Sequence, residues 1–158
     1  MNIDDYVINT QIGLSKIIDS YKKDSKNYYI LQSKDNINLE IEENDINTRK
    51  LLTKNEASSI LDNIKTLSDE WIKKPHERYA KYRSLVENRN IKDLIIVIKR
   101  LYIEDKYSYG KGLNSEANDI YLKAKKYLFE ELSLIYEINE DEVDNFIQHR
   151  TGESNNGI

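Results

Sequence analysis

Residues 70–85, with the sequence EWIKKPHERYAKYRSL, combine the only tryptophan of the 158-residue chain with a dense group of cations. The cations nearest to Trp71 are Lys73, Lys74, Arg78 and Lys81. Lys and Arg side chains neutralise phosphates without reading bases, and an apolar ring can be pushed into a strained base step. A tryptophan also suits a protein core, with its indole N–H bonded to a backbone carbonyl. The stretch therefore predicts either a nucleic-acid contact or a core anchor beside a solvated basic face.

Residues that perform catalysis or bind metals are scarce in this sequence. The chain has no cysteine, which excludes disulfides, thiolate zinc sites and cysteine nucleophiles. His76 and His149 are the only histidines, and neither has the spacing of a metal ligand. Residues 137–146 are acidic but lack the glycine and the alternating oxygen ligands of a calcium loop, so we interpret them as helix capping. We expect no catalytic residue, no metal and no cofactor.

Charge is divided unevenly along the chain. Residues 1–50 carry 7 basic and 9 acidic groups, residues 51–129 carry 16 and 11, and residues 130–158 carry 1 and 8. The net charge of −4 therefore hides a basic middle segment with a net charge of +5. This asymmetry is typical of a segment with an anionic partner, although a solvated helix face gives the same pattern.

Membrane-spanning and targeting signals are not visible in the sequence. The longest apolar run is LIIVI at residues 94–98, far short of the roughly 20 residues that span a bilayer. The opening residues MNIDDYVINT lack the basic and then apolar order of a signal peptide. Together with the absence of cysteine, these features predict a cytoplasmic protein without membrane contact. We expect a monomer.

The hydrophobic period changes near residue 52, which predicts two domains. Before this point, short runs rich in β-branched and aromatic residues alternate with turn-forming residues, as in a small antiparallel β domain. The predicted strands are DYVINT, LSKIIDSY, NYYILQS, INLEIEE and TRKLL. The N-terminal β domain is predicted to span residues 1–52.

Helices are predicted from residue 53 to residue 151. The helix signals are a capping box at Thr53 and Glu56, Pro75 in a first turn, a nearly apolar run at 90–105, a stripe from Ala117 to Leu128, and a second cap at Asn139 and Glu142. Residues 152–158 are predicted to form a disordered tail. The fold class is therefore α+β, with a small antiparallel β domain followed by an all-α domain.

The order of these segments resembles the CarD-like, or CdnL-type, bacterial transcription regulators. IDDYVINTQIGLSKIID is similar to the opening strand and turn of that family, and TRKLLTKNEASSIL to its crossover into helices. RYAKYRSLVENRNIKDLIIVIKRLY resembles its Arg-aromatic helix, polar turn and long apolar helix. LNSEANDIYLKAKKYLFEEL resembles its next helix.

The resemblance implies a function and a set of partners. In this family a Tudor-like β domain binds the RNA polymerase β subunit by edge-strand addition, and the helical domain contacts promoter DNA at the upstream edge of the melted bubble. The regulator thereby stabilises the open promoter complex. The DNA contact implied is not strongly sequence-specific.

The resemblance also assigns roles to individual residues. Trp71 is the expected wedge at the DNA fork, although Arg78 of the Arg-aromatic pair, which some relatives place close after the tryptophan, lies seven residues further on, with Pro75 between. The expected phosphate contacts are Lys73, Lys74, Arg78, Lys81, Lys123 and Lys126. The expected polymerase contacts are Lys22, Lys23, Glu40, Ile41 and Glu42, with acids where better-known relatives have a basic residue and a proline.

Two other classes of protein fit parts of the sequence. A protein-only adaptor would bind one partner with the β domain and another with the acidic helix at residues 140–149, and its basic face would only be solvated. An enzyme is the third class, and the sequence offers it no catalytic constellation.

Overall fold

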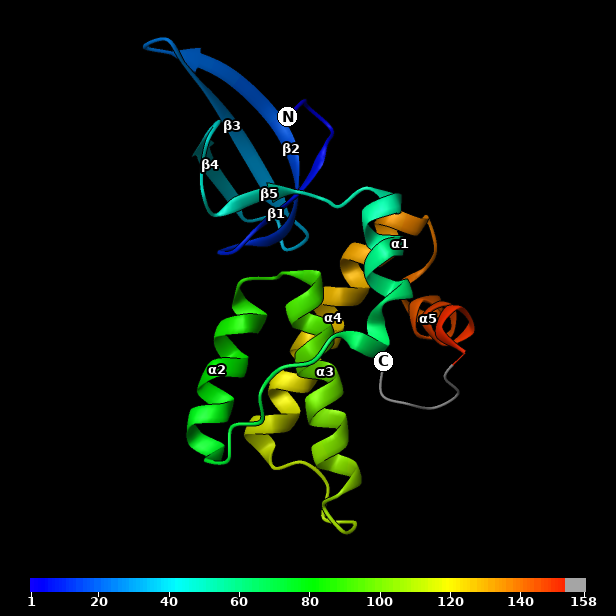
Figure 1. The fold of residues 1–158 in the computed structure, drawn as a ribbon. Coiled ribbons are helices and arrows are strands. Elements are labelled where there is room, and N and C mark those ends of the chain that lie inside the picture. Colours follow the sequence, from blue (N-terminus) through cyan, green and yellow to red (C-terminus); the bar gives the residue numbers. More distant parts are fainter. Residues whose placement is uncertain (153–158) are drawn as a thin grey trace. The chain divides into compact units, whose positions relative to one another are not determined.

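The computed structural model describes residues 1–152 and contains two compact units, Met1–Leu51 and Leu52–Ile158. The first is a β sheet and the second is helical (Figure 1). The predicted α+β fold class is confirmed by this arrangement of elements. The tail expected at residues 152–158 lies, from residue 153 onward, outside the described residues.

The β unit is a five-stranded antiparallel sheet with the strand order β4-β3-β2-β1-β5. Its strands are β1 (Tyr6–Asn9), β2 (Gly13–Lys23), β3 (Lys26–Ser33), β4 (Asn38–Glu42) and β5 (Thr48–Lys50). Asp24 and Ser25 connect β2 to β3 with positive φ angles of 50° and 65°, a two-residue turn whose twist suits a hairpin. The sheet order leaves β4 and β5 as the two edge strands.

The β unit buries a small apolar core on one face of the sheet. This core consists of Val7, Ile17, Tyr29, Leu31 and Ile41. Along β3 the buried and less buried residues alternate, as expected for a strand with one covered face. A register shift between Ile17 and Asp19 is followed by the exposed end of the β2–β3 hairpin, where both strands lose this alternation.

The helical unit contains five α-helices and two 3₁₀ helices within the described residues. The α-helices are α1 (Lys54–Asp62), α2 (Pro75–Glu87), α3 (Ile91–Lys106), α4 (Ser115–Tyr136) and α5 (Val143–Thr151). The 3₁₀ helices are η1 (Ile64–Thr66) and η2 (Glu140–Glu142). None of the helices that the structure describes is long and apolar enough to cross a membrane.

Local signals in the sequence explain where these helices begin. The capping box at Thr53 and Glu56 forms before α1, and the one at Asn139 and Glu142 forms before η2, as predicted. Pro75 occupies the first turn of α2, where its missing N–H has no consequence. The apolar run predicted to be a central helix is α3, whose buried residues include Leu94, Ile95, Val97, Ile98 and Leu101. Residues 67–74, between the end of η1 and the start of α2, form an irregular segment.

Candidate functional site

Trp71 lies in the irregular segment 67–74 and is 45% exposed. It is not part of the apolar cluster that forms the core of the helical unit. Trp71 therefore does not occupy the core position that was one of the two alternatives for it in the sequence. An indole in this position has both a supported side and a solvent-facing side.

The supported side of Trp71 faces Arg78 on α2. The guanidinium carbon of Arg78 lies 4.4 Å from the centroid of the Trp71 ring, within the range of a cation–π contact. Arg78 is only 4% exposed, which is unusual for a cation and requires partners for its charge. The Arg78 Nη1 group donates to the carbonyl oxygen of Ile72 at 2.8 Å and, less closely, to that of Lys73 at 3.3 Å.

Glu104 on α3 neutralises the Arg78 charge. The Nη2 and Nε groups of Arg78 donate to its two carboxylate oxygens at 2.9 Å and 3.2 Å, the paired geometry that suits a planar guanidinium. Burial lowers the pKa of Arg78, but Glu104 and, to a smaller extent, Tyr79 together more than offset burial, so the pKa of Arg78 is raised. The pair joins the first turn of α2 to the last turn of α3.

The same carboxylate is linked through Tyr79 to one further element, the start of α4. The Tyr79 hydroxyl donates to Glu104 Oε1, and Asn114, the N-cap of α4, donates from Nδ2 to the Tyr79 hydroxyl at 3.3 Å. Burial, followed by Glu104, raises the pKa of Tyr79. We call Arg78, Glu104, Tyr79 and Asn114 the Arg78 network; it brings α2, α3 and the start of α4 together beside Trp71.

Two other cations hold the remainder of segment 67–74. Lys99 on α3 donates to the carbonyl oxygens of Ile64 at 2.7 Å and Leu67 at 2.9 Å. Lys81 on α2 forms an ion pair with Asp69, which lowers the pKa of that carboxyl group. With Arg78, these contacts hold the segment on both sides of Trp71.

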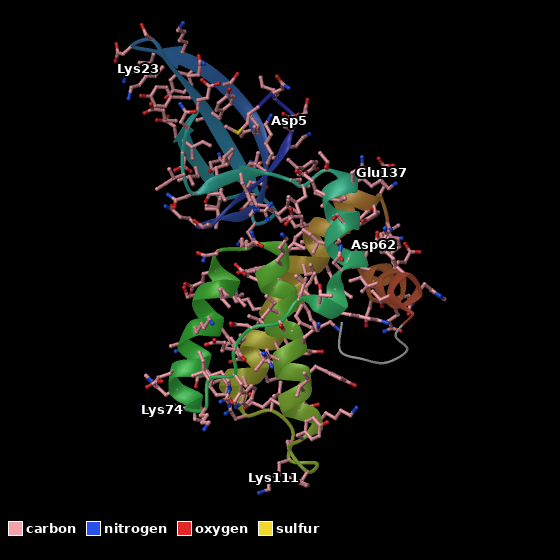
Figure 2. The ribbon with its side chains drawn as sticks, in the orientation of Figure 1. Asp5, Lys23, Asp62, Lys74, Lys111 and Glu137 are labelled. Atoms are coloured by element: carbon pink, nitrogen blue, oxygen red, sulfur yellow. The ribbon has the colours of Figure 1, made fainter. Side chains whose placement is uncertain are left out.

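The predicted phosphate contacts are not equivalent in the structure. Lys73 and Lys74 are exposed on the segment that carries Trp71, and Lys74 forms a solvated pair with Glu77 at 2.9 Å. Figure 2 shows Lys74 and the loop that carries Lys111 at the same end of the helical unit. By contrast, the Arg78 guanidinium is buried and bound to Glu104, and the phosphate contact expected of Arg78 stays a prediction.

Lys123 and Lys126 lie farther along α4, about 12–17 Å from its first residue at 1.5 Å per residue. Lys123 is exposed on a groove of 510 Å³ between α2 and α4, whose lining also includes Glu87, Glu116 and Asp119. Lys126 lies 4.0 Å from Glu130. These two lysines therefore occupy surroundings of mixed charge, whereas Lys73 and Lys74 adjoin Trp71.

The predicted polymerase contacts lie at two places in the β unit. Glu40, Ile41 and Glu42 form part of edge strand β4, and the side chain of Ile41 is buried in the sheet core. Lys22 and Lys23 are exposed at the end of β2, and Figure 2 shows Lys23 at the tip of the hairpin.

The acidic side chains of β4 have partners within the sheet. Tyr21 donates to Glu40 at 2.7 Å, and this bond raises the pKa of Tyr21 to about 12. Lys26 donates to Glu42 at 3.0 Å. Both acids are exposed beside a partly open hollow that also contains Ile46, which is 96% exposed.

Sequence reasoning missed Asp69, Lys99 and Glu104. Lys99 and Glu104 lie in the run that was predicted to be a buried helix, and a charge on such a helix requires a partner. That requirement was a usable signal for these two residues. Asp69 gave no comparable signal, because a carboxylate in an irregular polar segment is ordinary.

Comparison with known proteins identifies the family. The family described as CarD, C-terminal domain, matches residues 59–148, which is more than half of the chain and includes Trp71 and the Arg78 network. A search of curated proteins gave no match. On the strength of the family match, this chain belongs to the CarD family of transcription-related proteins.

Proposed function

We propose that the protein regulates transcription by binding the RNA polymerase β subunit with its β unit and promoter DNA with its helical unit, at the upstream edge of the bubble. The DNA contact stabilises the open promoter complex. The observation that carries this proposal is the exposed Trp71 ring, held by Arg78 and flanked by Lys73 and Lys74. Association with polymerase would place the protein on the nucleoid in the cytoplasm.

The proposed action of Trp71 follows from its two different sides. Arg78 supports the indole, and the exposed part of the ring is available to a base step. An apolar ring inserted at an unstacked step makes reclosure of the DNA strands less favourable. The charges of Lys73 and Lys74 attract the neighbouring phosphates of any sequence.

The proposed polymerase contact uses the edge of β4. An edge strand presents unpaired N–H and C=O groups that another strand can pair with. Glu43, directly after β4, donates its N–H to the carbonyl of Asn27 in β3. Because backbone groups alternate in direction along a strand, the N–H groups of Glu40 and Glu42 point to the free edge. The exposed Ile46 offers an apolar contact beside this edge.

Two measurements test the proposed function together. RNA polymerase β subunit should copurify with the tagged full-length protein from a bacterial lysate. The purified protein should lengthen the half-life of open complexes formed by that polymerase. Copurification without any change in open-complex half-life would contradict the DNA part of the proposal, and absence of copurification would contradict the polymerase part.

A protein-only adaptor is the second candidate, and one observation favours it. Arg78 and Lys81, two of the cations next to Trp71, are bound to Glu104 and Asp69 rather than turned to solvent. An adaptor would show no salt-dependent binding to duplex or forked DNA, whereas phosphate contacts require affinity to fall steeply with salt. A mobility-shift titration at several salt concentrations separates the two candidates.

A further inference from the structure

Segment 67–74 has no regular secondary structure, yet it is held at three positions by cations from the helices. Lys99 binds the Leu67 carbonyl, Lys81 binds Asp69, and Arg78 binds the Ile72 carbonyl. Hydrogen bonds from charged donors are stronger than those between neutral groups. The segment is therefore held by the helices on both sides of Trp71.

Arg78 is the contact that also touches the Trp71 ring. Its guanidinium lies 4.4 Å from the centroid of the Trp71 ring and 5.1 Å from that of Tyr79. A planar guanidinium can stack on one ring while its N–H groups bond in the plane, and a lysine ammonium cannot do this. Arg78 thus binds the backbone of the segment and one side of its tryptophan at once.

Glu104 determines where Arg78 can lie. A buried guanidinium needs a partner for its charge, and removing that partner leaves an uncompensated charge in the protein. Glu104 supplies both carboxylate oxygens, and Tyr79, itself bonded to Asn114, donates to the same carboxylate. The position of the guanidinium is therefore set by three helices that are packed together.

We propose that Arg78, held by Glu104, is a positioning residue that fixes the orientation of Trp71 before any partner binds. In its functional part this inference rests on the function proposed above, in which Trp71 acts at the DNA fork. A side chain that is already ordered loses less conformational freedom on binding, so the same contact stabilises the open complex more. A role in fold stability alone would leave the motion of the Trp71 ring unaffected in a variant that stays folded.

The test uses the full-length protein, in which Trp71 is the only tryptophan and its fluorescence can be read alone. Arg78→Lys keeps the charge but removes the planar group that reaches the ring, the carboxylate and the carbonyls together. Arg150→Lys is the matched control, because Arg150 forms another two-point pair, with Asp62, in the contact between α5 and α1.

The first measurement is the time-resolved fluorescence anisotropy of Trp71. We expect Arg78→Lys to lose the slowly decaying component that reports a restricted ring, and Arg150→Lys to keep it, at equal helical circular dichroism. A folded Arg78→Lys protein with wild-type anisotropy overturns the positioning role. Should Arg78→Lys not fold, Glu104→Gln gives the same decision, since the amide keeps the shape of the anchor and removes its charge.

The second measurement is the half-life of the open promoter complex, which separates this inference from the proposed function. Shorter half-lives with both Trp71→Ala and Arg78→Lys support the functional part. An unchanged half-life with Trp71→Ala contradicts the proposed function, while anisotropy loss in Arg78→Lys still supports positioning. A shorter half-life with Trp71→Ala alone, despite anisotropy loss in Arg78→Lys, overturns the functional part of the inference.

Discussion

Lys81 on α2 and Asp69 in the irregular segment form an ion pair in which the carboxylate side chain is 22% exposed and the lysine side chain 39% exposed. Asp69 Oδ1 also accepts a hydrogen bond of 2.7 Å from the backbone N–H of Glu70. On the N-terminal side of Trp71, the Asp69 carboxylate therefore adds to the hold that Lys99 has on the Leu67 carbonyl.

The first prediction concerns acid pH. Lys81 lowers the pKa of Asp69, so the stabilisation from Asp69 is fully present above its unfolded pKa of about 3.9 and is lost as the pH falls through the lower folded value. The contribution of Asp93 to the pH dependence of stability has the opposite sign, because burial and then Asp69 raise the pKa of Asp93. We expect the free energy of unfolding in an Asp93→Asn background to decline below about pH 4.

Asp69→Asn in the same background is the control for this prediction. It removes the titrating group and should flatten the part of the acid decline that belongs to Asp69, as measured by denaturant unfolding at a series of pH values. Identical pH profiles for the two proteins would show that the Asp69 charge does not stabilise the fold.

The second prediction concerns Trp71→Ala. Truncation of a fully buried tryptophan costs about 3–5 kcal/mol, but Trp71 is 45% exposed, so we expect a loss of about 1–2 kcal/mol in the free energy of unfolding. The variant should bind polymerase normally and shorten the half-life of open complexes. Trp71→Phe should keep part of the half-life, because a planar apolar ring remains. A loss of polymerase binding in step with the loss of stability would point to a structural role instead.

The third prediction concerns the cations. Lys73→Ala and Lys74→Ala should each weaken DNA binding equally on different sequences and reduce the slope of log affinity against log salt by about one unit. Lys123→Ala and Lys126→Ala test the second group in the same assay. Lys92→Ala, an exposed lysine in the first turn of α3, is the control and should leave the slope unchanged. Weakening on only one DNA sequence would indicate base recognition.

The fourth prediction concerns the β4 edge. Glu40→Pro removes an N–H that points away from β3 and should abolish binding to the polymerase β subunit while the sheet stays folded. Glu40→Ala loses the same bond from Tyr21 but keeps the N–H, and it should still bind. A pull-down with both variants is sufficient, and equal binding by Glu40→Pro and Glu40→Ala would exclude pairing at this edge.

The fold could be predicted where the signals are local. The cap at Thr53, the proline at residue 75 and the apolar run of α3 each act within a few residues, so composition and spacing reveal them. Antiparallel strands joined by short turns are equally local.

The site could be predicted only in part. Trp71 and its neighbouring lysines stand out in the sequence by type and spacing. The partner of Arg78 does not, because Glu104 is far along the chain and meets Arg78 only when α2 and α3 pack. The burial of Arg78, for which the phosphate contact stays a prediction, therefore could not be read from the sequence.

The acidic side chains of β4 also restrict which strands can pair with it. Two copies of this chain that met edge to edge would bring the Glu40 and Glu42 carboxylates of both copies close together. Like charges in facing positions repel, so the strand disfavours its own copy and favours a strand that carries Lys or Arg. We therefore expect the chain to remain monomeric at high concentration, and the same two carboxylates to select a basic strand on the partner.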